Sequence, residues 1–163
     1  MEEWSQSQIR RSILASSGFT DLGMYQEAVR ELEELPESIR GSTPILIAWL
    51  ELYQGWQKWS EAMAIAEHLI AREPKDPNWP VAFAFATRRA INLPAALNIL
   101  EEAVLSFPGC ATIHFNLACY HAQLHHLEQA TQYLQHACQL DATFRAAAQT
   151  DPDLAVLRQA NLV

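Results

Sequence analysis

The sequence is poor in the residues on which phosphate binding, cross-linking and membrane insertion depend. Its five glycines are scattered, so the sequence contains no glycine-rich phosphate loop or dinucleotide fingerprint. Its three cysteines form no CxxC pair and cannot all pair with one another, which favours reduced structural thiols in a cytoplasmic protein. No apolar run approaches the roughly 20 residues of a membrane-spanning helix. The acidic start of the chain, at residues 1–4, is unlike a secretory signal.

Positive charge is also scarce. The chain has 11 lysines and arginines against 19 aspartates and glutamates, for a formal net charge of −8. A nucleic-acid backbone or an anionic membrane surface attracts a basic protein, so we expect neither as a partner. These exclusions favour a protein or peptide partner.

Alanine recurs at a fixed interval of 34 positions. The four residues are Ala28, Ala62, Ala96 and Ala130. Prolines recur at the same interval, at positions 74 and 108, and apolar residues between them follow helical spacing. A 34-residue period of this kind predicts an array of helix–turn–helix repeats in which the alanines lie where helices approach closely.

The period divides the chain into four repeats within one predicted domain, residues 1–163. The repeats cover about 9–42, 43–76, 77–110 and 111–144. Within the last three repeats, helices are predicted near 44–54 and 60–72, 78–91 and 94–107, and 112–124 and 127–140. Two capping helices follow within about 142–159, near 142–149 and 153–159, and the segment Thr150-Asp151-Pro152 predicts an N-cap followed by a first-turn proline for the second. The first repeat is the least regular, because Pro36 ends its second helix early.

Three repeats carry a common set of apolar and small residues in the same register. The second repeat has Leu46, Trp49, Leu50, Tyr53, Ala62, Ala66, Leu69 and Pro74; the third has Phe83, Ala84, Ala96, Leu100, Ala103 and Pro108; the fourth has Leu117, Ala118, Ala130, Leu134 and Ala137. This pattern, over about residues 9–142, resembles the tetratricopeptide repeat (TPR) family, in particular its small bacterial members. The resemblance implies an all-α, right-handed superhelical α-solenoid.

The resemblance also implies a concave groove lined by the first helix of each repeat. The residues at the groove positions are Ile13, Ser17, Ile47, Glu51, Val81, Phe85, Arg88, Arg89, Phe115, Cys119 and Gln123. Their apolar stripe with an arginine pair suits a segment that has apolar anchors and a carboxylate. Two alternatives stay open: the chain's own C-terminal part or another copy of the chain covers the groove, and Glu51 pairs internally with an arginine.

Ionisable residues elsewhere give little support for a metal or for catalysis. His121 and His125 have the spacing of a helical metal chelate, but His114 and His121 stand at packing positions, and His125 and His126 fall in a turn. The paired glutamates at 33–34 and 101–102 lie on second helices, where a solvated outer face accounts for them. We therefore expect no metal, no cofactor and no enzyme activity.

These observations predict a non-catalytic scaffold that binds a peptide or partner protein in its groove, with self-association left open. The alternative is a bacterial secretion-type chaperone that keeps an export substrate partly unfolded. Both predictions depend on the repeat frame, and neither identifies the partner.

Overall fold

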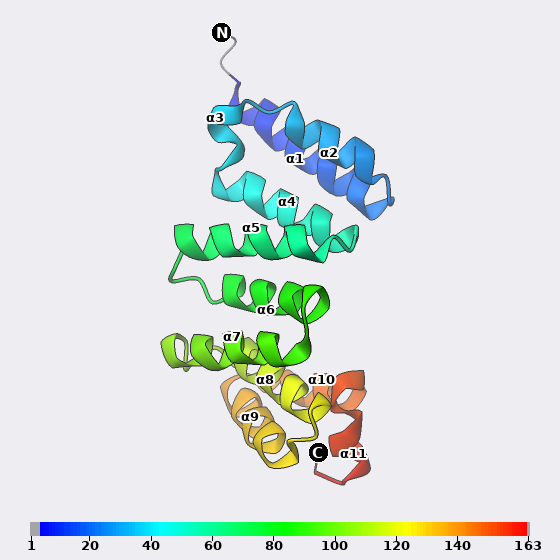
Figure 1. Ribbon diagram of the computed structural model, residues 1–163, viewed down its shortest axis with the longest axis vertical. Coiled ribbons are helices and arrows are strands. Elements are labelled where there is room, and N and C mark those ends of the chain that lie inside the picture. The colour runs from blue at the N-terminus through cyan, green and yellow to red at the C-terminus, as the bar shows by residue number, and fades with distance from the viewer. Residues whose placement is uncertain (1–3, 163) are drawn as a thin grey trace. The chain divides into compact units, whose positions relative to one another are not determined.

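The computed structural model describes residues 4–162, and its ordered elements are all helices (Figure 1). Within those residues there is no β-strand. The chain divides into two compact units, Met1–Trp79 and Pro80–Val163, and the boundary falls near the start of one helix. Each unit is described separately below. The prediction of a single domain stays a prediction.

The first unit contains five helices. They are α1 (Gln6–Asp21), α2 (Tyr25–Glu33), α3 (Glu37–Arg40), α4 (Thr43–Gly55) and α5 (Trp59–Arg72). Ser5 begins α1 with a capping box, because its side chain accepts from the Gln8 amide while the Gln8 side chain accepts from the Ser5 amide. Pro36 separates α2 from α3, as the sequence predicted, and Pro44 lies in the first turn of α4, where a missing N–H costs little.

Small and branched residues let the helices of the first unit pack closely. Its core includes Ala28, Leu32, Ile45 and Leu52, all fully buried. At the start of α2 and the end of α4, the Tyr25 hydroxyl donates to the Gly55 carbonyl over 2.9 Å. These contacts join α1, α2 and α4 into one packed group.

The second unit holds the last two repeats and the C-terminal helices. Its elements are α6 (Asn78–Ala90, whose first two residues belong to the first unit), α7 (Leu93–Ser106), α8 (Ala111–Gln123), α9 (Leu127–Leu140), α10 (Phe144–Thr150), the 3₁₀ helix η1 (Pro152–Leu154) and α11 (Ala155–Gln159). Asn92 caps α7 by accepting from the Ala95 amide over 2.8 Å. Apolar residues of α7, α8, α9 and the C-terminal helices share one core.

The helix boundaries agree with the predicted frame to within one or two residues. In the second repeat the first helix is Thr43–Gly55, against a predicted 44–54, and α9 begins and ends where expected. The C-terminal part differs. A 3₁₀ turn and α11 replace the single predicted closing helix. The N-cap within the segment Thr150-Asp151-Pro152 is Asp151, whose side chain accepts from the Asp153 amide.

The four periodic alanines occupy the packing positions that their spacing predicts. Ala28, Ala62, Ala96 and Ala130 are all 0% exposed. A larger side chain at any of them would have to displace a neighbouring helix, since protein interiors have few voids. The 34-residue period is therefore a period of close helix contacts.

Candidate partner-binding site

In the first unit, the predicted groove residues lie on α1 and α4. Ile13, Ser17 and Ile47 are half-buried, and Glu51 is exposed. Ile13 borders an open hollow of about 510 Å³ between α1, α3 and the start of α4. The hollow is lined by Gln6, Ile9, Arg10, Ile13, Ile39, Ser42 and Pro44.

Arg10 is a residue of this hollow that the sequence analysis missed. It lies one residue from Ile9 and one helical turn before Ile13, and its side chain is exposed. An exposed arginine on this helix carries no distinguishing sequence signal, because only the packing of α1, α3 and α4 makes it border the hollow. The hollow therefore combines aliphatic side chains with one guanidinium group.

In the second unit, Val81, Phe85 and Arg89 lie on α6. Val81 is half-buried against the core, while Phe85 is 37% exposed. The Arg89 guanidinium carbon lies 3.5 Å from the centre of the Phe85 ring, and its Nη1 donates to the Phe85 carbonyl over 3.0 Å. Partial burial of the guanidinium lowers the pKa of Arg89. The side chain of Arg89 thus covers the ring one turn earlier on its own helix.

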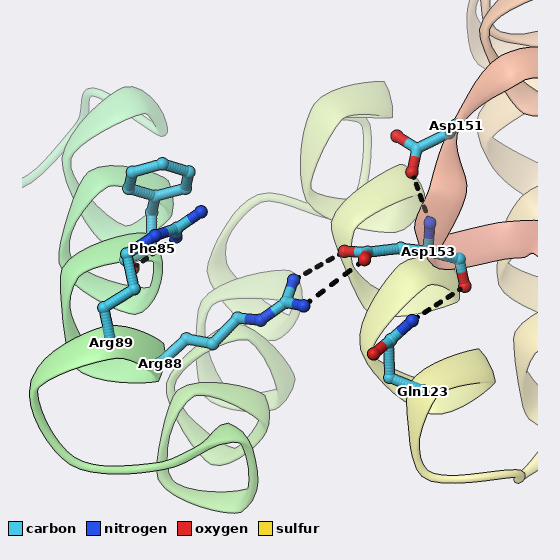
Figure 2. A network of polar contacts seen from close by, with 6 residues as sticks. All are labelled: Phe85, Arg88, Arg89, Gln123, Asp151 and Asp153. Carbon is cyan, nitrogen blue, oxygen red and sulfur yellow. Dashed lines mark hydrogen bonds and ion pairs between the residues drawn. The ribbon is translucent and has the colours of Figure 1, made fainter.

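Arg88 points the other way, toward the C-terminal part of the chain (Figure 2). Its Nη1 and Nη2 donate to the two carboxylate oxygens of Asp153, over 2.5 and 3.3 Å. This hydrogen-bonded pair raises the pKa of Arg88. The internal partner of Arg88 is therefore Asp153, and not Glu51, which the sequence analysis had considered. Arg88 and Arg89, adjacent in sequence, serve different contacts.

Two of the three groove positions on α8, Phe115 and Cys119, are covered by the chain itself, whereas Gln123 is exposed. Phe115 is 8% exposed and stacks on Phe144 of α10, with ring centres 4.6 Å apart. Gln123 donates to the Asp153 carbonyl over 3.5 Å. Cys119 is 4% exposed, and burial raises the pKa of its thiol. In this part of the predicted groove, the chain's own C-terminal part covers two of the groove positions, which is one of the alternatives that the sequence left open.

The histidines have packing and turn roles. His114 is 7% exposed and its Nε2 lies 2.8 Å from the Pro108 carbonyl. His121 stacks on Tyr133, and its Nδ1 lies 3.3 Å from Nδ1 of His126. His125 lies in the turn with a φ of 59° and is exposed. His121 thus contacts the imidazole of His126. It does not contact His125, although the spacing of His121 and His125 had suggested a metal chelate.

One cluster within residues 4–162 has three side chains of metal-ligand type, Cys119, Asp151 and Asp153, with ligand atoms within 4.8 Å of one another. These residues do not fit a cation. The Asp153 carboxylate already accepts from the Arg88 guanidinium, whose positive charge would repel a cation, and Asp151 accepts from a backbone amide. The arrangement is accounted for by the Arg88–Asp153 pair.

The paired glutamates have the exposure predicted for an outer face. Glu33, Glu34, Glu101 and Glu102 are all exposed, and Oε1 of Glu101 lies 3.6 Å from Nε2 of His121. No helix within residues 4–162 has the length and apolar character that crossing a bilayer requires.

Comparison with known proteins identifies the fold. No family model matches the sequence, and no curated protein matches it. Among solved structures, the chain resembles a thermophilic TPR protein from Thermus thermophilus, with a TM-score of 0.66 and 17% identity over 93% of this chain and 82% of that one. It also resembles MamA from Desulfovibrio magneticus RS-1, with a TM-score of 0.65 and 16% identity over 83% of this chain and 76% of that one. At these identities the likeness concerns the fold alone, and it confirms that the chain has the all-α solenoid fold of the tetratricopeptide repeat family.

Proposed function

We propose that this protein is a non-catalytic interaction scaffold that binds a segment of a partner protein along the first helices of its repeats. The observation that carries the proposal is the open hollow in the first unit, where Ile9, Ile13 and Ile39 surround a space beside the Arg10 guanidinium. Ser17, Ile47 and Glu51 belong to the proposed surface of that unit. Within the second unit, Val81, Phe85 and Arg89 form a separate proposed surface on α6.

The chemistry of the hollow favours a partner segment with aliphatic side chains and a carboxylate. Aliphatic walls gain free energy by removing apolar surface from water, about 25 cal/mol for each Å² buried. A guanidinium group holds a carboxylate through two parallel N–H···O bonds, which fixes the orientation of the bound segment. Because the chain carries a net charge of −8, an exposed arginine beside an apolar surface is a distinguishing feature of this site.

The exposed residues of the proposed surfaces indicate which further groups a partner would present. Glu51 would contact a donor or a basic group of the partner, and Phe85 with Arg89 would add an aromatic surface that already carries a cation. We further propose that the protein acts in a bacterial cytoplasm, because its cysteine content favours a reducing compartment and its repeats resemble those of small bacterial members of the family. Neither a cofactor nor a metal enters this function.

The test is affinity capture from native lysate with the full chain, followed by mass spectrometry, for three variants beside the unchanged protein. Arg10→Glu and Glu51→Lys alter the proposed surface, and Arg30→Glu reverses an exposed arginine on α2 as the matched control. We expect the same captured protein to be lost, by tenfold or more, with each groove variant and retained with the control. This loss corresponds to about 1.4 kcal/mol or more.

Equal capture by all variants would refute the groove as the binding surface. Capture of one export substrate in a partly unfolded state would favour the secretion-type chaperone over a general scaffold. Thermal melts of each variant separate lost binding from lost folding.

A further inference from the structure

The C-terminal segment, residues 144–159, engages groove positions of the second unit in the manner of a bound ligand. It places an aromatic ring, Phe144, on Phe115 of α8, and a carboxylate, Asp153, on Arg88 of α6. Gln123 donates to its backbone at the Asp153 carbonyl, as Figure 2 shows. One stacked ring, one forked ion pair and one contact to the main chain are the kinds of contact by which a groove holds a peptide.

We propose that the C-terminal segment is an intramolecular competitor, which occupies this part of the groove until a partner segment of the same chemistry replaces it. The partner would present an aromatic side chain to Phe115 and, further along its chain, a carboxylate to Arg88. This inference rests on the proposed scaffold function and adds a means of regulating access to the groove.

Two features of the segment would allow a partner to displace it. Its helices, α10 and α11, are seven and five residues long, too short to be stable without docking. The side chains of Arg88 and Asp153 are each 25% exposed, so a competing carboxylate can reach the pair from solvent. The segment is therefore ordered by its contacts rather than by its own helical propensity.

The anchors of the segment are two leucines. Leu154 and Leu157 are 0% exposed and belong to the core that α8 and α9 also form. Their burial makes the docked state dominant and the open state a minor population, reached by local opening. A partner binds only the open state, so its apparent affinity is reduced in proportion to the fraction of molecules that are open. A change within the segment that weakens its docking, and leaves the groove residues intact, should strengthen binding by the same factor.

The experiment uses the full chain and a synthetic, fluorescently labelled peptide with the sequence of residues 142–162 as the probe. Asp153→Asn removes the charge of the docked segment while leaving Arg88 and both leucines in place. Asp21→Asn makes the same chemical change at an exposed position of the first unit and is the matched control. Hydrogen exchange, read by mass spectrometry, follows the amides of residues 154–159 against those of α9.

We expect Asp153→Asn to speed exchange in residues 154–159 at least tenfold, with α9 unchanged, and to bind the peptide at least tenfold more tightly than the unchanged chain. Arg88→Ala added to Asp153→Asn should abolish that gain, because the peptide carries its own Asp153. Asp21→Asn should behave as the unchanged chain.

The proposal is overturned if residues 154–159 exchange only at the rate of α9, because the segment would then be a fixed part of the core. It is also overturned if the peptide fails to bind Asp153→Asn, or binds it equally with and without Arg88. Neither readout uses the Arg10 hollow or a captured partner, so failure here is distinguishable from failure of the proposed function.

Discussion

Replacing Arg88 with alanine should destabilise the second unit far more than the same replacement at Arg89. The two residues are adjacent in sequence and on one helix, so helix propensity changes almost equally in both variants. Their contacts differ. Arg88 donates both terminal nitrogens to Asp153, whereas Arg89 lies over the ring of Phe85 and donates to a carbonyl of its own helix.

The size of the Arg88 effect follows from the burial of its ion pair. Exposed pairs are worth about 0–1 kcal/mol, and removing one partner of a fully buried pair costs about 3–5 kcal/mol. With both side chains 25% exposed, the Arg88–Asp153 pair lies between these limits, and we expect Arg88→Ala to lower the free energy of unfolding by about 2 kcal/mol. An exposed cation–π contact is worth about 0.5–1 kcal/mol, which sets the expected loss for Arg89→Ala.

Two optical probes report on different parts of the chain. All five tryptophans lie at or before position 79, so tryptophan fluorescence follows the first unit. Far-ultraviolet circular dichroism follows the helices of both units. In chemical denaturation, Arg88→Ala should therefore shift the transition followed by circular dichroism and leave the transition followed by tryptophan fluorescence unchanged. A double-mutant cycle with Asp153→Asn should give a coupling of about 1 kcal/mol or more.

Equal losses for Arg88→Ala and Arg89→Ala, or a coupling near zero with Asp153→Asn, would refute the assignment of Arg88 to the C-terminal segment. If Arg88→Ala lowers the free energy of unfolding by the expected amount but shows no coupling to Asp153→Asn, the stabilisation by Arg88 comes from contacts other than Asp153.

Three further outcomes are expected in the packed helices. Ala96→Leu should cost about 1–3 kcal/mol by overpacking a fully buried position, and Ala64→Leu on the exposed side of α5 should not; equal denaturation midpoints for the two would refute the repeat register. Gly55→Ala should destabilise the first unit, because its new methyl group would lie 2.8 Å from Cγ2 of Thr20. Adding Thr20→Ser removes that methyl group of Thr20 and should restore most of the lost stability. No restoration would contradict this cause. Burial lowers the pKa of His121 from its ordinary 6.5, so the unfolded chain binds this proton at a higher pH than the folded chain does, and the free energy of unfolding should decline as pH falls below about 6.5. Urea denaturation across pH should show a shallower decline for His121→Gln. An equal decline in the two proteins would exclude His121 as the cause.

The repeat architecture could be predicted from the sequence because it is encoded locally. The helical spacing of apolar residues and the prolines at helix starts act within one or two turns of a helix, and the 34-residue period repeats this local pattern along the chain. The sequence therefore placed α4 and α9 within a residue of their true ends and the periodic alanines at fully buried positions. The roles of His114 in packing and of His125 in a turn followed from the same frame.

The candidate site could be predicted only in part, because groove positions are fixed by the repeat but their occupants are not. Arg88 and Phe115 lie on the predicted first helices of their repeats, yet their partners, Asp153 and Phe144, come from the C-terminal segment. Arg10 escaped notice because an exposed arginine on a polar helix has no sequence signal, and only the arrangement of α1, α3 and α4 makes it border a hollow.

The sequence by itself thus determined the repeat, the helices and the faces they bury, since these depend on interactions between residues close along the chain. The tertiary structure decided which charges and rings meet. Residue 88 reaches residue 153 across 65 positions, and such a pair depends on where the returning chain packs rather than on any local preference. Packing of Leu154 and Leu157 against the last repeat fixes that return, and the ion pair forms as its consequence.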